Sequence, residues 1–259
     1  MGQRVSWRSW LDGSVVAQVA LAVMRDATGR IEPLEPLAPV RPAALREGQV
    51  IAFWSLAAGA GASTVAALTA QRSAAGGRPA LLADLDRRAP VQALRAGNSG
   101  ATVADALLRP GAEQDVLSRW GDVPLLPGSP TLGRSWDGTQ LAGLVGRLRL
   151  STPVVIDLGS GVEALDPDLL AVIDHLCVVV GPTVAQLQAA FCSVPLLERV
   201  AVAGTVVVGA GDDDATRIAS RLPWRSLARV PRDPFLAADD FAVRAPTVRA
   251  IDVLIRSLH

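Results

Sequence analysis

The amino-acid sequence predicts an α/β fold with three layers, in which a mostly parallel sheet carries helices on both faces. Two observations lead to this prediction. From Gln49 onward, apolar runs of strand length alternate with stretches of helical character. The runs are almost continuously hydrophobic, which is typical of strands buried on both faces of a parallel sheet. With 259 residues, the chain is long enough to build such a core as one domain.

The expected elements follow one another in a regular order. The expected strands are residues 50–56, 79–86, 123–128, 153–161, 175–181, 204–211 and 227–234. The expected helices are residues 63–75, 136–148, 184–200 and 214–222, with a further helix at the C-terminus. Gly76 and Gly77 supply a stop for the first helix, because glycine tolerates the left-handed conformation. Pro195 should kink or end the third helix.

The C-terminal helix has one apolar face, formed by Ile251, Leu254, Ile255 and Leu258 at helical spacing. Its polar face carries arginines and an aspartate rather than a basic cluster. We therefore expect it to dock on the core of the domain. A membrane-binding amphipathic tail is the alternative.

The domain organisation changes near residue 49. Residues 1–48 are expected to form an N-terminal extension with a Pro-rich linker, and residues 49–259 the α/β domain. The segment 31–48 contains four prolines, which favour an extended linker or a strap over the domain. The apolar stretch before it is too short to span a bilayer.

The composition excludes several kinds of chemistry. All 25 basic residues are arginines, so no lysine is available for catalysis or for phosphate binding. They are balanced by 25 acidic residues, and the zero net charge gives no strong signal for nucleic-acid binding. Two isolated cysteines form neither a disulfide framework nor a zinc site. With no signal peptide and no transmembrane segment in the sequence, we expect a cytoplasmic protein.

A small-residue loop follows the first expected strand. Residues 55–64 read SLAAGAGAST and lead directly into the first helix. A phosphate-binding loop needs glycines, a helix N-terminus, a Ser/Thr for Mg²⁺ and usually a lysine. Gly59, Gly61 and the Ser63 hydroxyl are present, whereas the lysine is absent. The loop therefore has the form of a nucleotide site, but a turn that merely packs a helix on a sheet would look similar.

Other features fall at the ends of expected strands. Asp84 and Asp86 end the second strand, and Asp157 with its Gly-Ser-Gly ends another. Ligands of parallel α/β sheets bind at the carboxyl ends of the strands. These carboxylates are therefore expected near the loop.

A dinucleotide-binding enzyme of the Rossmann type is an alternative. Gly59-x-Gly61-x-x-Thr64 approximates the dinucleotide fingerprint, and Asp84 follows at the distance of a ribose-binding acid. The third glycine is missing, and no acid/base for hydride transfer is evident downstream.

The order of these motifs resembles the MinD/ParA family of deviant Walker A ATPases over residues 49–258, and most of all its CpaE/TadZ pilus-assembly branch. The loop ends Gly-Ala-Ser-Thr, as in that branch. "DLD" resembles the switch I region, "VVIDLGSGVE" the Walker B strand, "VVVGPTVAQLQAA" the next strand and helix, and "VPRDP" a late segment of the family. The resemblance implies a P-loop NTPase-like fold of the MinD/ParA type.

The resemblance also implies site residues. The nucleotide-binding residues would be Gly59, Ala60, Gly61, Ala62, Ser63 and Thr64. Ser63 and Asp157 would hold Mg²⁺ if a nucleotide binds. Asp84 and Asp86 would be catalytic, orienting the attacking water, if the protein is active. The cofactors are accordingly either ATP or ADP with Mg²⁺, or none.

The chain departs from the family at the charges that matter most for hydrolysis. Both lysine positions of the deviant loop are alanine here, at Ala57 and Ala62. Phosphoryl transfer depends on positioning and electrostatics, so losing these charges should remove several kcal/mol of transition-state stabilisation. No arginine lies in the loop to replace them.

These observations favour a pseudo-ATPase, with ATP hydrolysis as the alternative of an active ATPase in the same fold. By resemblance the protein would be a scaffold or localisation factor for a Tad-type pilus or secretion machine, or for septum-site placement. The expected partners are proteins of a membrane-associated machine and a second copy in a homodimer. It would act in the cytoplasm or peripherally at the inner face of the membrane.

Overall fold

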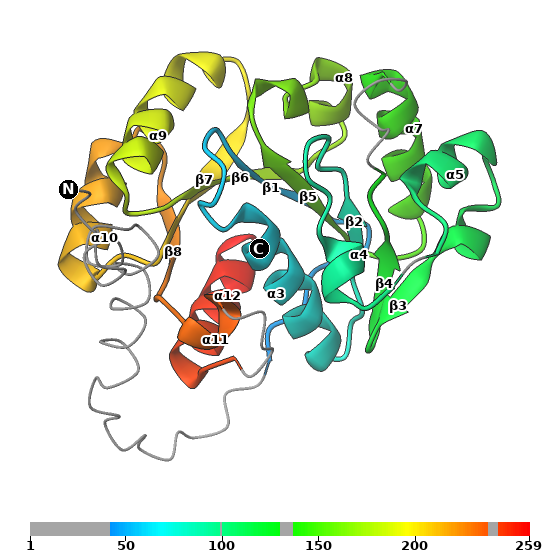
Figure 1. Ribbon diagram of the computed structural model, residues 1–259, viewed down its shortest axis with the longest axis horizontal. Helices are drawn as coiled ribbons and strands as arrows, with labels where there is room; N and C mark the ends of the chain where they lie inside the picture. The colour runs from blue at the N-terminus through cyan, green and yellow to red at the C-terminus, as the bar shows by residue number, and fades with distance from the viewer. Residues whose placement is uncertain (1–41, 99, 130–136, 238–242) are drawn as a thin grey trace, which may run out of the picture. The chain divides into compact units, whose positions relative to one another are not determined.

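A computed structural model describes residues 42–98, 100–129, 137–237 and 243–259 (Figure 1). The strands are β1 Val50–Ser55, β2 Leu81–Asp84, β3 Ser118–Trp120, β4 Val123–Leu126, β5 Val154–Ser160, β6 His175–Val180, β7 Val202–Val208 and β8 Ser226–Val230. The helices are α3 Ala62–Ala75, α4 Gln92–Arg95, α5 Val103–Leu108, α7 Gly138–Leu148, α8 Pro167–Leu170, α9 Val184–Leu196, α10 Asp212–Arg221, α11 Pro234–Ala237 and α12 Ala245–Ser257. Short 3-10 helices span Glu113–Val116 and Val162–Ala164.

The strands form one eight-stranded sheet in the order β3-β4-β2-β5-β1-β6-β7-β8. All neighbours are parallel except β3 and β4, which form an antiparallel hairpin at one edge. β1 lies in the middle of the sheet between β5 and β6, and β5 separates it from β2. This order places the carboxyl ends of β1, β2 and β5 next to one another, along the side of the sheet where parallel strands end.

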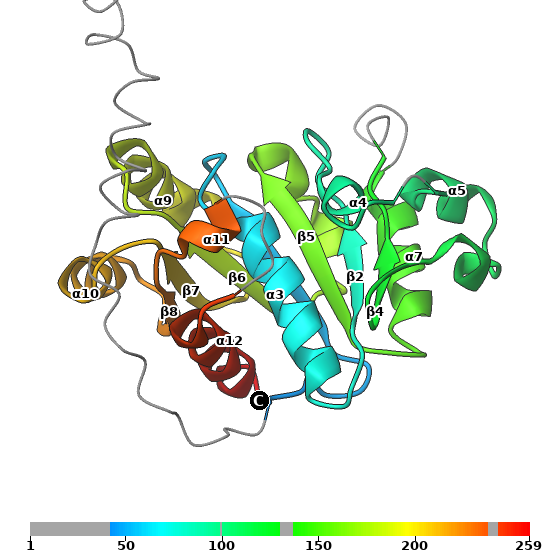
Figure 2. The same cartoon turned by 60° about the horizontal axis from the view of Figure 1, so that its bottom comes forward.

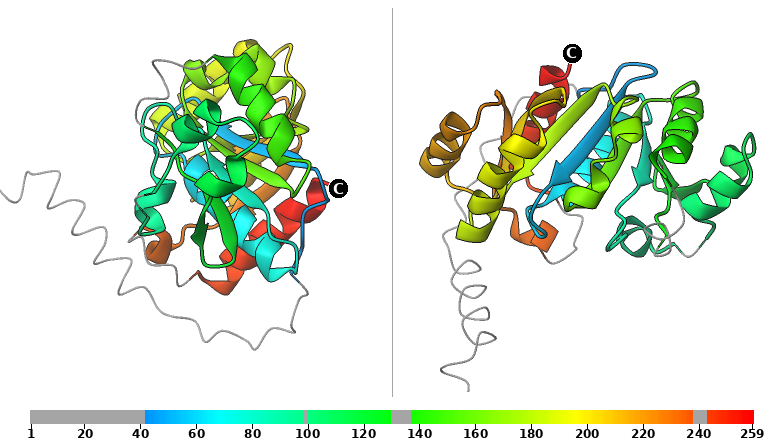
Figure 3. Two further views of the ribbon diagram at one scale, coloured as in Figure 1. Left: turned by 90° about the vertical axis from the view of Figure 1, so that its right-hand side faces the viewer. Right: turned by 90° about the horizontal axis from the view of Figure 1, so that it is seen from above.

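Helices cover both faces of the sheet, which confirms the predicted three-layer α/β fold. α3 and α12 lie side by side on one face, as Figure 2 shows. α5, α7, α8, α9 and α10 pack on the opposite face, which the view from above in Figure 3 displays. Alternate residues of β1 enter the two cores: Phe53 packs toward α3, and Trp54 packs toward the other layer.

The C-terminal helix docks on the core, as its apolar face predicts. Leu254 and Ile255 of α12 are fully buried, and Ile251 and Leu258 are nearly so. Among the described helices, none has the length and hydrophobicity required to cross a bilayer.

The chain just before β1 is held against α3 and α12. The backbone N–H of Ala43 donates to Oδ1 of Asp252 at 3.0 Å, and that of Leu45 donates to Oγ of Ser73 at 3.1 Å. Both Ala43 and Leu45 are buried in the core. This end of the Pro-rich segment thus lies on the domain, whereas residues 1–41 lie outside the described residues.

Several predicted bounds shift. The predicted helix 136–148 begins at Gly138, where the Asp137 carboxylate caps the N–H of Gln140. The predicted helix 184–200 ends at Leu196, directly after Pro195. Proline removes one hydrogen-bond donor and crowds the preceding turn, so the early end agrees with the expected effect.

Candidate functional site

The loop between β1 and α3 begins the candidate site. Gly59 has a φ of 75° and Gly61 a φ of 100°, conformations that residues with a side chain rarely adopt. A Cβ at Gly61 would also lie 3.2 Å from Cγ1 of Val208. These two glycines therefore allow the turn that carries the chain from the central strand into the helix.

The N-terminus of α3 is open toward this loop. Gly61 precedes the helix and offers no side-chain cap. Within the described part of the chain, the backbone N–H groups of Ala62, Ser63 and Thr64 donate to no protein acceptor. Unpaired N–H groups and the positive end of the helix dipole favour an anion at this position.

The loop borders a pocket of about 450 Å³. Residues 57–64 form one wall, and Asp86, Arg95, Gly159 and Leu236 are among the other lining residues. Among the described residues that line it, Arg95 is the only basic one. Backbone donors with one guanidinium suit a phosphate group, because guanidinium binds phosphate oxygens with two parallel hydrogen bonds.

Two buried carboxyl groups lie next to the loop on adjacent strands. Asp84 of β2 pairs in register with Asp157 of β5, and both are fully buried. Asp84 accepts hydrogen bonds from the backbone N–H groups of Gln92 (3.0 Å) and Asp86 (3.3 Å). Asp157 accepts from the N–H of Gly159 at 2.9 Å and from Nε2 of Gln92 at 2.7 Å.

Gln92 of α4 joins the carboxyl pair to the loop. Its Nε2 also donates to the backbone carbonyl oxygen of Ser63 at 2.8 Å. The amide thus bridges the start of α3 and the end of β5. Its Oε1 is buried and has no hydrogen-bond partner among the described residues.

The carboxyl groups have raised pKa values because they are buried. Burial, and then the nearby charge of Asp157, raises the pKa of Asp84 to about 8. Burial also raises the pKa of Asp157, while hydrogen bonds from the side chains of Gln92 and Ser63 oppose the rise. A protonated carboxyl at this position therefore reduces the negative charge behind the loop.

Asp86 has a different environment. It lines the pocket, and its Oδ1 accepts the N–H groups of Arg88 (2.8 Å) and Ala89 (3.1 Å). A Cβ on Gly159 would lie 2.1 Å from the Asp86 carboxyl, so only glycine allows this approach. Asp86 therefore shapes the turn after β2 at the rim of the pocket.

The carboxyl groups of Asp84 and Asp157 are already engaged by protein donors. Every oxygen of Asp84 and Asp157 already accepts a hydrogen bond from an N–H donor. In the described parts of the chain, no three His, Cys, Asp or Glu side chains form a group that could hold a metal ion. By contrast, the loop donors and Arg95 fit the phosphates of a nucleotide.

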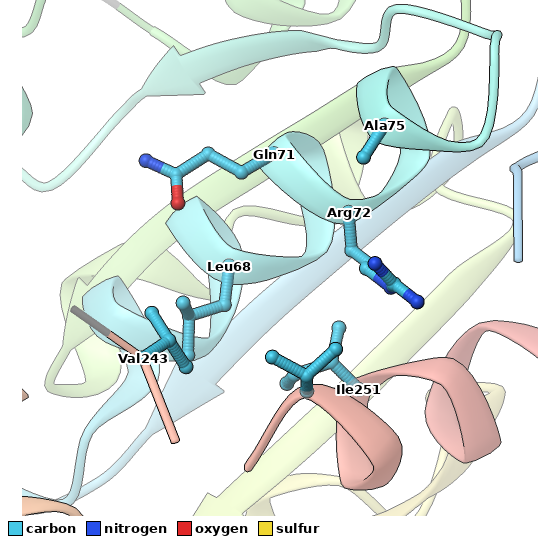
Figure 4. Close-up of a pocket in the computed structure, with 7 residues that line it drawn as sticks. Leu68, Gln71, Arg72, Ala75, Val243 and Ile251 are labelled. Carbon is cyan, nitrogen blue, oxygen red and sulfur yellow. The ribbon is translucent and has the colours of Figure 1, made fainter. Parts of the chain in front are cut away.

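A second, smaller pocket of about 140 Å³ lies between α3 and α12 (Figure 4). Its walls are largely apolar, with Leu68 and Ile251 on opposite sides. Its one basic side chain, Arg72, is engaged by Asp252 through Nε (2.7 Å) and Nη2 (2.8 Å). We assign no chemistry to this pocket.

The structure brings most of the predicted site residues together. All the predicted nucleotide-binding residues line the larger pocket: Gly59, Ala60, Gly61, Ala62, Ser63 and Thr64. Asp84 and Asp157 lie side by side, and Asp157 receives a hydrogen bond from Ser63. Their roles toward a nucleotide or Mg²⁺ remain predictions.

Two residues of the site are missed by sequence reasoning, Gln92 and Arg95. Both belong to α4, which is only four residues long. A single helical turn is too short to show hydrophobic periodicity, so no sequence pattern predicts it.

No protein-family model matches this chain, and no curated protein does. Solved structures do match. MinD, the septum site-determining protein of Pyrococcus horikoshii complexed with Mg-ADP, has a TM-score of 0.65 and 19% identity, covering 80% of this chain and 94% of its own. The ParA family ATPase of Chlorobium tepidum has a TM-score of 0.62 and 18% identity, covering 82% and 98%.

This chain has the MinD/ParA fold. A further match is the MinC:MinD cell division protein complex of Aquifex aeolicus, with a TM-score of 0.65, 20% identity, and coverage of 80% and 94%. At these identities the likeness establishes the fold alone. It confirms the P-loop NTPase-like architecture that the motif order implies.

Proposed function

We propose that this chain is a MinD/ParA-like protein whose P-loop pocket no longer supports ATP hydrolysis. It acts as a scaffold or localisation factor, of the CpaE/TadZ type, for a Tad-type pilus or secretion machine or for septum placement. The observation that carries the proposal is a complete P-loop pocket in which Ala57 and Ala62 occupy the lysine positions.

The surroundings of Asp157 support the loss of catalysis. Its oxygens accept hydrogen bonds from the N–H of Gly159 and from Nε2 of Gln92, and the Ser63 side chain also bonds to this carboxyl. Hydrolysis requires positioned charge around the transferred phosphoryl group. Without the lysines, the loop supplies no side-chain positive charge for the transferred phosphoryl group.

The alternative of an active ATPase retains the nucleotide-binding loop. It requires Ser63 and Asp157 to share a hydrated Mg²⁺, and the Ser63 side chain already forms a hydrogen bond with the Asp157 carboxyl. The Rossmann alternative is disfavoured by topology. In that fold the first two strands of the nucleotide-binding unit are neighbours, whereas β5 separates β1 from β2 here.

The proposed partners are proteins of a membrane-associated machine, with the protein acting in the cytoplasm or at the inner face of the membrane. The MinD of Aquifex aeolicus forms a complex with MinC. That example makes protein recognition a reasonable use of the same fold. We propose a homodimer that uses the loop face, and an N-terminal extension, residues 1–48, that precedes the α/β domain.

The test is phosphate release from Mg-ATP by the full chain, run beside light scattering for the mass of the particle. We expect no turnover above that of the Asp157→Asn variant. Turnover in the range of about 1 s⁻¹ or faster, lost in Asp157→Asn, would overturn the proposal in favour of the active ATPase.

A further inference from the structure

The outer face of α9 is apolar, although it is exposed. The helix contains no charged residue, and Gln188 is the one exposed residue along it whose side chain has a nitrogen or oxygen atom. Val184, Phe191 and Leu196 are 81%, 49% and 45% exposed. By contrast, α12 exposes arginines and buries its apolar side. A helix that is apolar on all sides is normally buried, so the outer face of α9 requires a cover.

A cavity continues this apolar face toward α10. It measures about 410 Å³ and lies between α9 and α10, at the end of the sheet that Figure 1 shows on the left. Phe191 of α9 and Ile218 of α10 are among its apolar lining residues. Its charged lining residues, Asp214, Arg217 and Arg221, all belong to α10. An apolar centre beside a charged margin is the usual arrangement of a protein–protein interface.

α10 carries charges of opposite sign at its two ends. Three aspartates, residues 212–214, form its first turn, and Arg221 lies in its last turn. Arg217 lies between them, and all these residues are exposed. The ion pair between Arg217 and Asp214 within the helix is long, at 3.9 Å, and such exposed pairs contribute little stability. When two of these helices lie antiparallel, the acidic start of each faces the basic end of the other.

We propose that the face formed by α9 and α10 binds the same face of a second copy of this chain, about a two-fold axis. A two-fold contact uses one surface twice, so that surface must be complementary to itself. α9 meets this requirement because it brings no like charges together. α10 meets it because its two ends have opposite charge. The three aspartates would repel an anionic lipid or a nucleic acid, and they therefore favour a protein partner.

This self-association goes beyond the proposed function and does not rest on it. The cavity between α9 and α10 shares no lining residue with the pocket at the loop. Together with the homodimer proposed for the loop face, a second self-association surface would let the chain build assemblies larger than a dimer, as a scaffold requires. Phosphate release decides the proposed function, whereas particle mass decides this inference, so either can fail alone.

The first experiment measures the particle mass of the full chain by light scattering, against 26.9 kDa for one chain. The contact belongs to the small end of specific interfaces, so the chain is studied at about 100 μM. Phe191→Asp should halve the mass of the particle, because it buries a carboxylate at the centre of the contact. Val184→Asp should do the same, and its 81% exposure in the single chain makes loss of folding no explanation.

The matched control is Leu108→Asp. Leu108 is 69% exposed and lies on α5, at the opposite end of the sheet (Figure 1), so this variant should keep the mass of the unaltered protein. Circular dichroism verifies that each variant is folded. A mass of 26.9 kDa for the unaltered chain would overturn the inference and leave the α9 face to a partner of another sequence. An unchanged mass in both α9 variants would overturn it in favour of self-association elsewhere, such as the loop face.

The second experiment tests the two-fold pairing of charges on α10. One variant combines Arg217→Glu with Arg221→Glu, and the other combines Asp212→Arg with Asp213→Arg. Sedimentation equilibrium in about 50 mM salt limits the screening of exposed charges. Each variant alone should associate about tenfold more weakly than the unaltered chain, because like charges now face each other. An equal mixture should recover the affinity of the unaltered chain to within about twofold. A mixture that associates no more tightly than either variant alone would overturn the two-fold arrangement.

Discussion

The buried carboxyl pair makes the stability of this protein depend on pH in an unusual direction. The folded-state pKa of Asp84 is about 8, against an ordinary value of 3.8. Between these values the folded chain holds a proton that the unfolded chain releases. Stability is therefore greatest below pH 4 as far as this group is concerned, and falls as pH rises toward 8. The slope is about 1.4 kcal/mol per pH unit for one proton.

The perturbation is Asp84→Asn, which removes the titrating group while keeping its size. Urea unfolding of both proteins, followed by tryptophan fluorescence at pH 5, 6, 7 and 8, yields the difference in unfolding free energy at each pH. We expect the unfolding free energy of Asp84→Asn to rise relative to that of the unaltered protein by about 1 kcal/mol or more for each pH unit. Summed over the full interval, roughly 6 kcal/mol is an upper bound on the change in unfolding free energy, because Asp157 shares the effect.

The matched control is Asp105→Asn. Asp105 is half-buried at the start of α5, and hydrogen bonds from the backbone and side chain of Thr102 lower its pKa. It is ionised in both states over this pH range, so its substitution should produce a constant difference. A difference for Asp84→Asn that stays constant from pH 5 to 8 would refute the account of the buried pair.

Three further predictions concern the loop and the core. Gly61→Ala should lower the unfolding free energy in urea by about 1–2 kcal/mol, because alanine is strained at positive φ; an unchanged midpoint would contradict the loop geometry. Leu254→Ala should cost about 2–5 kcal/mol in the same assay, while Val253→Ala on the exposed side of α12 should stay within about 0.5 kcal/mol. Equal effects would contradict docking of this helix. Ala62→Lys should tighten ADP binding by about tenfold in calorimetry, since it restores a charge at the phosphates; no gain would show that the alanine is not what limits affinity.

Much of the fold follows from patterns that the sequence carries locally. Continuous apolar runs predict the buried parallel strands, since both faces of such strands are covered. The spacing of Ile251, Leu254 and Ile255 predicts a docked helix, and the structure confirms it. Gly59 and Gly61 predict a turn that only glycine permits, and both have positive φ.

The rest depends on contacts between distant segments. The hairpin partner β3 is a three-residue strand, Ser118–Trp120, with an exposed middle residue. It is therefore too short and too polar to stand out. β5 lies between β1 and β2 although it follows both in the sequence. No local sequence pattern encodes this strand order.

The candidate site divides in the same way. The loop and the aspartates can be predicted, because all of them follow the carboxyl ends of strands. A parallel sheet places these ends on the same side. Gln92 and Arg95 are not, because their importance comes from where a single turn of helix lies in space. The in-register pairing of Asp84 with Asp157 is likewise visible only once the strand order is known.

The most direct test of the central claim is phosphate release from Mg-ATP by the full chain, measured beside Asp157→Asn at saturating ATP. A P-loop pocket with alanine at both lysine positions and with Asp157 held by Gln92 should release phosphate no faster than the variant. Sustained turnover that disappears in Asp157→Asn would contradict the claim and establish an active ATPase.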